Sequence, residues 1–229
     1  MEFGLLAAAL IAAVCVRLTL AAEAATVAPE QDSGRLWDLA LLSAFVGLGV
    51  GRIGAMVAGG TNPLAHPLDV LILRGGVDTV LASVGAVVAF GIAARRALVV
   101  TADAIAPAVI AGLAGWHAGC FTRGACLGTP SNLPWSISGP SGVGRHPVEI
   151  YAAVLLAAAA VVALVLLKTR HARPRMIAGL AIGFASGARL ATEPMRLGIG
   201  NSPLWWYAGG VAAGGAAVAA AIVVGRHRG

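Results

Sequence analysis

Arg189, Glu193 and Arg196 form the pattern Arg-x3-Glu-x2-Arg near the end of an apolar stretch. Residues three and four positions apart share one face of a helix, so we expect the Glu193 carboxylate to lie between the two guanidinium groups. Two positive charges against one predict a net cationic cluster. Because a guanidinium offers a planar pair of donors that suits phosphate, the pattern indicates a phosphate site. The alternative is a structural ion pair that fixes this helix to a neighbour.

A second group of reactive residue types lies in residues 115–151, with the sequence GWHAGCFTRGACLGTPSNLPWSISGPSGVGRHPVEIY. Arg145 would add a phosphate contact. His146 carries an imidazole, the side-chain group best suited to exchanging a proton near neutral pH. Tyr151 follows one helical turn into the next apolar run. An interfacial cap and a tyrosine anchor are the alternative interpretation of these residues.

The same stretch predicts neither a metal site nor a cofactor. His117, Cys120, Cys126 and His146 have the spacing of no common zinc site. No HExxH motif, nucleophile elbow or Walker loop is present in the sequence. The sequence leaves the thiol state of Cys120 and Cys126 open, and Cys15 stands alone in an apolar run.

The elements that must position these residues are apolar. Hydrophobic residues make up 59% of the 229 residues, charged residues make up 11%, and the mean hydropathy is +0.86. A soluble domain carries about a quarter charged residues, whereas runs of about twenty apolar residues suit helices that cross a bilayer. The sequence therefore predicts an all-α integral membrane protein. Its net charge of +6 comes from basic residues strung along short loops, which does not indicate a nucleic-acid partner.

We expect about seven transmembrane helices in a single polytopic membrane domain that covers residues 1–229. The predicted ranges are 4–22, 37–59, 77–94, 98–116, 148–167, 176–195 and 204–224.

The basic loop residues predict the orientation of these helices. Arg95 and Arg96, the basic residues 168–175 and the tail with Arg226 and Arg228 would all fall on one side of the membrane. Short cytoplasmic loops are enriched in such residues. We therefore expect a cytoplasmic C-terminus, an N-terminus outside, and an extracytoplasmic loop or head region at residues 117–147.

The order of motifs resembles the bacterial prolipoprotein diacylglyceryl transferases. The resemblance covers residues 40–200 and rests on GVGRIGAMV, LRGGVDTVLASVGA, DAIAPAVIAGLAG, GCFTRGACLGTP, RHPVEIY and the Arg-x3-Glu-x2-Arg pattern. It implies a multi-pass enzyme of the bacterial plasma membrane. Such an enzyme moves the diacylglyceryl group of phosphatidylglycerol to the thiol of a lipobox cysteine in a preprolipoprotein signal peptide, forms a thioether and releases glycerol phosphate.

The resemblance also implies roles for individual residues. Arg189 and Glu193 would be catalytic, and His117 or His146 would assist deprotonation of the thiol. Residues for binding phosphatidylglycerol or another anionic phospholipid would be Arg196, Arg145, Tyr151, Gly128, Arg52 and Arg123.

This chain departs from the family pattern at several polar positions. His117 stands where the family signature has arginine, Cys120 and Arg123 stand at its two asparagines, and Ala125 stands at its glutamate. The histidine expected in the third helix is missing, and Ala152 replaces a residue that is usually acidic. Two classes of function remain open: a divergent transferase, which we favour, and a non-catalytic relative that binds anionic lipid or a partner protein.

Overall fold

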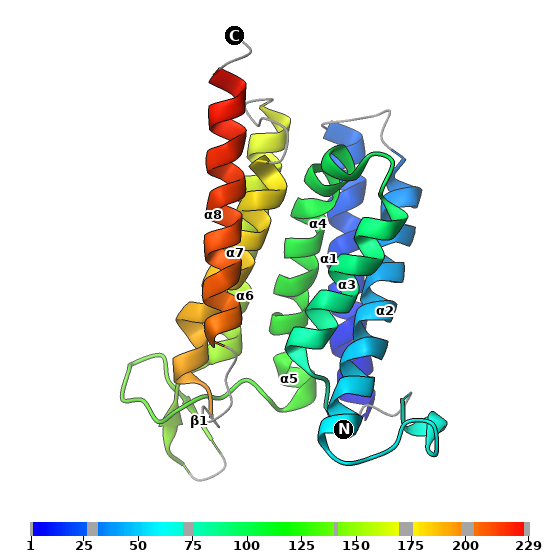
Figure 1. The fold of residues 1–229 in the computed structure, drawn as a ribbon. Coiled ribbons are helices and arrows are strands. Elements are labelled where there is room, and N and C mark those ends of the chain that lie inside the picture. The colour runs from blue at the N-terminus through cyan, green and yellow to red at the C-terminus, as the bar shows by residue number, and fades with distance from the viewer. Residues whose placement is uncertain are drawn as a thin grey trace. The chain divides into compact units, whose positions relative to one another are not determined.

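The computed structural model describes residues 2–26, 32–70, 76–139, 142–169, 176–197 and 204–226 (Figure 1). Contacts within the chain divide it into two compact units, one formed mainly by residues 3–31 and 102–229 and the other by residues 32–101. The single polytopic domain expected from the sequence stays a prediction. Of the basic residues used to predict the orientation, Arg170, Arg173, Arg175 and Arg228 lie outside the described residues.

The unit of residues 32–101 is a pair of helices. It contains α2 (Ser33–Ala58), the short 3-10 helix η1 (Pro67–Val70) and α3 (Thr79–Ala93). A Cβ atom on Gly47 would lie 2.7 Å from the backbone oxygen of Ala82, and one on Gly85 would lie 2.9 Å from Val50 Cβ. These helices therefore pack with their backbones close together, which small residues permit in membrane proteins.

The other unit contains the remaining helices and a short hairpin. Its elements are α1 (Glu2–Thr26), α4 (Leu98–Ala118), α5 (Cys120–Arg123), β1 (Ile137–Ser138), β2 (Gly144–Arg145), α6 (Val148–Lys168), α7 (Met176–Thr192), the 3-10 turn η3 (Glu193–Met195) and α8 (Leu204–Arg226). The first residues of α4, up to Thr101, belong to the helix-pair unit. The strands β1 and β2 pair antiparallel.

Close helix packing also brings α1 against α4. A Cβ atom on Gly115 would lie 3.1 Å from Ala12 Cα, and one on Gly119 would lie 2.8 Å from Ala8 Cα. Gly119, which directly follows α4, faces an earlier residue of α1 than Gly115 does, so the two helices run antiparallel. The C-terminal end of α4 is thus fixed to the beginning of α1.

Helices α4, α6 and α7 share one apolar core. Ile110 of α4, Leu156 of α6 and Ile177 of α7 are each at most 1% exposed and belong to this cluster. Asp103 on α4 accepts a hydrogen bond from the backbone N–H of Ala178 at 2.8 Å. This carboxylate therefore caps the otherwise unsatisfied first turn of α7 from a neighbouring helix.

The observed helices match the predicted ranges to within a few residues, with one physical difference. The helix predicted at 176–195 ends at Thr192, and residues 193–195 form a 3-10 turn. Pro194 lies in this turn, and a proline has no backbone N–H to continue an α-helix.

Five helices in the described residues are long and apolar enough to cross a membrane: α1, α2, α4, α6 and α8. Helix α3 is apolar but has 15 residues, and α7 has 17. The structure therefore agrees with an all-α membrane protein and does not test the full number of seven spans.

Candidate functional site

The candidate site lies at one end of the larger unit, where α4 and α7 end and α6 and α8 begin (Figure 1). His117 is in the last turn of α4, Glu149 in the first turn of α6, and Arg189 in the last turn of α7. Glu193 and Arg196 follow in and directly after η3. Three segments that are distant in the sequence therefore contribute polar groups to one place.

Glu149 is the centre of this cluster, and its role was not predicted from the sequence. The residue is 4% exposed. Its Oε2 accepts a hydrogen bond from His117 Nδ1 at 2.5 Å, because a carboxylate can only accept. Its Oε1 lies 2.8 Å from Nη1 of Arg196 and 4.0 Å from Nη1 of Arg189. One buried carboxylate thus holds an imidazole and faces two guanidinium groups.

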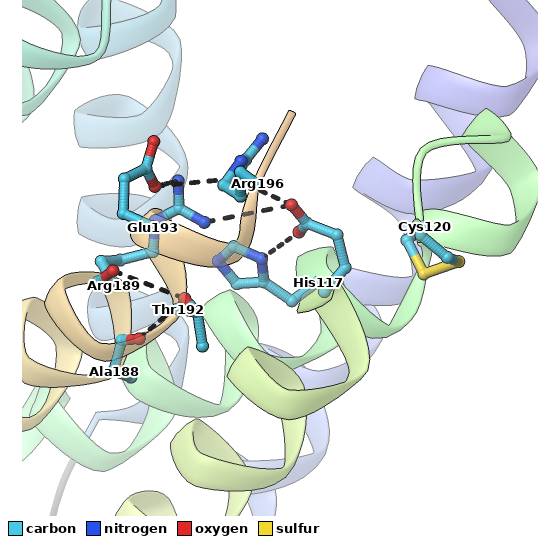
Figure 2. A network of polar contacts seen from close by, with 9 residues as sticks. His117, Cys120, Ala188, Arg189, Thr192, Glu193 and Arg196 are labelled. Carbon is cyan, nitrogen blue, oxygen red and sulfur yellow. Dashed lines mark hydrogen bonds and ion pairs between the residues drawn. A yellow bond between two sulfur atoms is a disulfide. The ribbon is translucent and has the colours of Figure 1, made fainter. Parts of the chain in front are cut away.

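The residues Arg189, Glu193 and Arg196 are together, as their spacing predicts (Figure 2). Arg189 Nη2 donates to Glu193 Oε2 at 2.7 Å, and Arg196 Nη1 lies 4.0 Å from the same oxygen. Glu149 adds a second carboxylate beside the two arginines, which the sequence pattern did not include. Sequence spacing cannot show this charge, since Glu149 belongs to another helix.

Arg189 is held on several sides. Its guanidinium carbon lies 5.5 Å from the centre of the Tyr207 ring at the start of α8, in the geometry of a cation–π contact. Its Nη1 is buried and has no hydrogen-bond partner among the described residues. A buried donor without a hydrogen bond is costly, and Glu149 Oε1, at 4.0 Å, is beyond hydrogen-bond range.

Gly128 packs against the backbone next to two members of the cluster. A Cβ atom at this position would overlap the backbone oxygen of Met195 and the side chain of Val148. Gly128 N–H donates to His146 O at 2.8 Å, and the next N–H, of Thr129, donates to Met195 O at 2.7 Å. Only glycine allows this approach, which places residues 128–129 between the start of α6 and η3.

Arg145 and His146 are tied to their own neighbourhood. Arg145 Nη1 donates to Gly128 O at 3.1 Å. His146 Nδ1 lies 3.5 Å from the Tyr151 hydroxyl oxygen, with the two rings edge to face. The Tyr151 hydroxyl oxygen also accepts a hydrogen bond of 2.8 Å from Trp135 Nε1. These residues form a second polar group next to Gly128.

Arg52 is not placed in the cluster. Arg52 belongs to the helix-pair unit, where Nε donates to Asp69 O at 3.0 Å and Nη1 donates to Gly76 O at 3.2 Å. These bonds hold the connection between α2 and α3. Arg123 ends α5, and its side chain lies outside the described part of the chain.

Cys120 and Cys126 form a disulfide, which answers the question that the sequence left open. Both residues are buried, at 0% and 6% exposure. Cys120 lies three residues after His117, and Cys126 lies two residues before Gly128. The bond therefore closes the segment that connects α4 to the Gly128 turn (Figure 2).

Comparison with known proteins places the chain in a family. The family model for prolipoprotein diacylglyceryl transferase matches residues 2–226. Three relatives carry the name phosphatidylglycerol–prolipoprotein diacylglyceryl transferase. The protein of Cupriavidus necator is 37% identical over 95 residues (38% of this chain and 35% of the relative), that of Cupriavidus pinatubonensis 30% over 145 residues (57% and 51%), and that of Methylococcus capsulatus 38% over 101 residues (42% and 37%). The matched regions thus span between about a third and about half of these relatives. The match to the family model covers almost all of the chain, and the chain belongs to the prolipoprotein diacylglyceryl transferase family.

Proposed function

We propose that this protein transfers the diacylglyceryl group of phosphatidylglycerol to the cysteine thiol of a preprolipoprotein lipobox. The observation that carries the proposal is the buried His117–Glu149 pair joined to Arg189 and Arg196 in a member of this family. In the reaction the cysteine sulfur forms a bond to the glyceryl carbon, the bond from that carbon to the phosphate oxygen breaks, and glycerol phosphate leaves. The thiol proton passes to a base.

Arg189 and Arg196 would stabilise the leaving phosphate. Negative charge grows on that group as the carbon–oxygen bond breaks, and fixed positive groups in a largely dry site offset it most effectively. Both arginines already contact carboxylates, with Arg189 held by Glu193 and Arg196 by Glu149. These carboxylates fix the directions of the guanidinium groups before lipid binds.

His117 would take the thiol proton. Its Nδ1 is bonded to Glu149, which fixes the ring and leaves Nε2 as the nitrogen that can accept a proton. A carboxylate behind a histidine holds the reactive tautomer and stabilises the imidazolium that forms. The same pair would therefore let a histidine act at a position where the family signature has arginine.

The second polar group would contact the rest of the substrates. We assign Arg145, His146, Tyr151 and Gly128 to substrate binding or to support of the site, because they adjoin the turn that packs on Val148 and Met195. Arg52 and Arg123 remain proposed lipid contacts. The acceptor would be the signal peptide of a preprolipoprotein, and the donor would be phosphatidylglycerol or another anionic phospholipid.

In the proposed topology, seven helices cross the bacterial plasma membrane as one polytopic domain, with the N-terminus outside and the C-terminus in the cytoplasm. Residues 117–147 then face the extracytoplasmic side. The Cys120–Cys126 disulfide supports this orientation, since disulfides persist in oxidising compartments outside the cytosol. Helices α3 and α7, with 15 and 17 residues, are the shortest of the proposed spans.

Replacing Arg189 by alanine tests the proposed function. With purified protein in lipid nanodiscs, labelled phosphatidylglycerol and a synthetic lipobox peptide, Arg189→Ala should lower the transfer rate by about 10²-fold or more, the range seen when one transition-state donor is lost. Arg35→Ala is the matched control, because Arg35 is exposed at the start of α2. Full activity of Arg189→Ala would remove the phosphate role. Arg189-dependent lipid binding without any transfer by the unaltered protein would favour the non-catalytic relative.

A further inference from the structure

We propose that the Cys120–Cys126 disulfide is a positioning element of the candidate site, and that efficient transfer depends on its being oxidised. The disulfide joins the backbone that carries His117 to the backbone that packs beside Glu149 and Arg196. The part of the proposal that concerns rate rests on the proposed function. The part that concerns geometry stands on the contacts alone.

On one side, the disulfide is anchored to the fixed end of α4. A Cβ atom on Gly119 would lie 2.8 Å from Ala8 Cα, so this end of α4 is pressed against α1. Thr122 in α5 donates from Oγ1 to Gly4 O at 2.8 Å. His117 and Cys120 therefore lie in a segment that contacts with α1 hold in place.

On the other side, the disulfide is anchored to the turn at residues 126–129. Gly128 has no room for a side chain between Met195 O and Val148, and Thr129 N–H donates to Met195 O at 2.7 Å. Val148 directly precedes Glu149, and Met195 directly precedes Arg196. A shift of this turn would therefore move Glu149, which binds His117, and Arg196, which contacts Glu149.

The segment between the two cysteines has little structure of its own. Its helix α5 contains four residues and is followed by Gly124, whose φ of +64° is the left-handed conformation that favours glycine. One turn of helix does not persist without support from the rest of the fold. The disulfide therefore links the end of α4, which carries His117, to the Gly128 turn.

Formation of the Cys120–Cys126 disulfide is a two-electron oxidation. Oxidation removes two protons and two electrons from the two thiols and forms the sulfur–sulfur bond. The electron acceptor is the disulfide of a thiol oxidant on the extracytoplasmic side, which becomes a dithiol. Dithiothreitol runs the step in reverse, because it gives two electrons and two protons to the protein sulfurs and closes to its own cyclic disulfide.

Two readouts test the proposal in the full-length protein, after reduction with dithiothreitol and in the double variant Cys120→Ala/Cys126→Ala. The first is hydrogen exchange of the Gly128 and Thr129 amides, which should become at least tenfold faster, while the amide of Ala178, bonded to Asp103, should not change. The second is transfer kinetics, in which kcat should fall about tenfold or more because misplacement of reacting groups by about 1 Å is enough for such a loss.

The split between kcat and KM separates positioning from loss of the fold. The Arg189–Glu193 contact lies within α7 and η3 and does not pass through the disulfide segment, so KM for the lipid should change by a smaller factor than kcat. Reoxidation of the reduced protein should restore both readouts. Cys15→Ser should respond to dithiothreitol as the unaltered protein does, since Cys15 lies outside the bond.

The possible outcomes separate the positioning role of the disulfide from the proposed transfer activity. Unchanged exchange and unchanged kcat after complete reduction would overturn the positioning role. A loss of Ala178 protection together with that of Gly128 would also overturn it, because the bond would then support the whole fold. If the oxidised protein transfers no diacylglyceryl group, the proposed function fails, and exchange at Gly128 and Thr129 alone decides the role of the disulfide.

Discussion

At the scale of single residues, Glu149 is the group that joins His117 to Arg189 and Arg196. The spacing of Arg189, Glu193 and Arg196 predicts that they lie close together, and they do so although α7 ends at Thr192. Glu149 reaches His117 across 32 positions of the sequence, which no local pattern encodes. The available signal was an acidic residue at the start of a very apolar helix, since a charge in such a place requires partners.

Replacing Glu149 by glutamine should disable the His117 pair while preserving the shape of the side chain. The variant loses the negative charge that faces two guanidinium groups and one imidazole. We expect the free energy of unfolding to fall by about 3 kcal/mol, since breaking a buried ion pair leaves uncompensated charge. We also expect transfer to fall by at least tenfold. Thermal unfolding in detergent and the transfer rate measure the two effects.

Asp38→Asn is the matched control for this change, because Asp38 is an exposed carboxylate on α2. It should alter neither the thermal midpoint nor the rate. If Glu149→Gln behaves like this control, Glu149 does not organise the site, and the central contact of the cluster has no role in stability or transfer.

At the scale of elements, the helices were predictable because their apolar runs have the length of a bilayer span. The partners of each helix were not predictable, since the glycines that permit close packing occur throughout the sequence. Gly214 illustrates the difference: a Cβ atom there would lie 2.5 Å from the backbone N of Gly183 on α7, whereas one on the adjacent Gly215 would meet nothing within 4 Å. Only the structure distinguishes these neighbouring residues.

Replacing Gly214 by alanine should therefore separate α7 from α8. We expect a loss of about 1–3 kcal/mol in stability, the usual cost of inserting a methyl group into a packed interface. Transfer should also fall, because α8 carries Tyr207 against Arg189. Gly215→Ala is the control and should be neutral or slightly stabilising in a thermal unfolding measurement. Equal midpoints for the two variants would mean that α7 and α8 do not pack as closely as described.

At the scale of the whole molecule, the candidate site, the hairpin and the disulfide belong to one unit of the chain. The sequence predicts which side of the membrane this end faces through the distribution of basic loop residues. The disulfide adds independent support, because it requires an oxidising compartment. The pairing itself was left open by the sequence, since two cysteines in one loop do not reveal whether they are joined.

Thiol labelling of intact cells tests this orientation. In a Cys15→Ser background, Ser138→Cys on the exposed hairpin should react with a membrane-impermeant maleimide from outside. Thr169→Cys, exposed after α6, should react only after the cells are permeabilised. Cys120 and Cys126 should not react unless the protein is first reduced, because their sulfurs are bonded to each other. Labelling of Thr169→Cys in intact cells would reverse the proposed topology.

The most direct test of the whole account is the chemical identity of the product. Purified protein in phosphatidylglycerol nanodiscs would be incubated with a lipobox peptide, and the peptide would be measured by mass spectrometry before and after treatment with hydroxylamine. We predict a gain in mass equal to one diacylglyceryl group that resists hydroxylamine, as a thioether does, and no product with a Cys→Ser peptide or with His117→Ala. An unmodified peptide, or a hydroxylamine-labile acyl thioester, would contradict the proposed transfer.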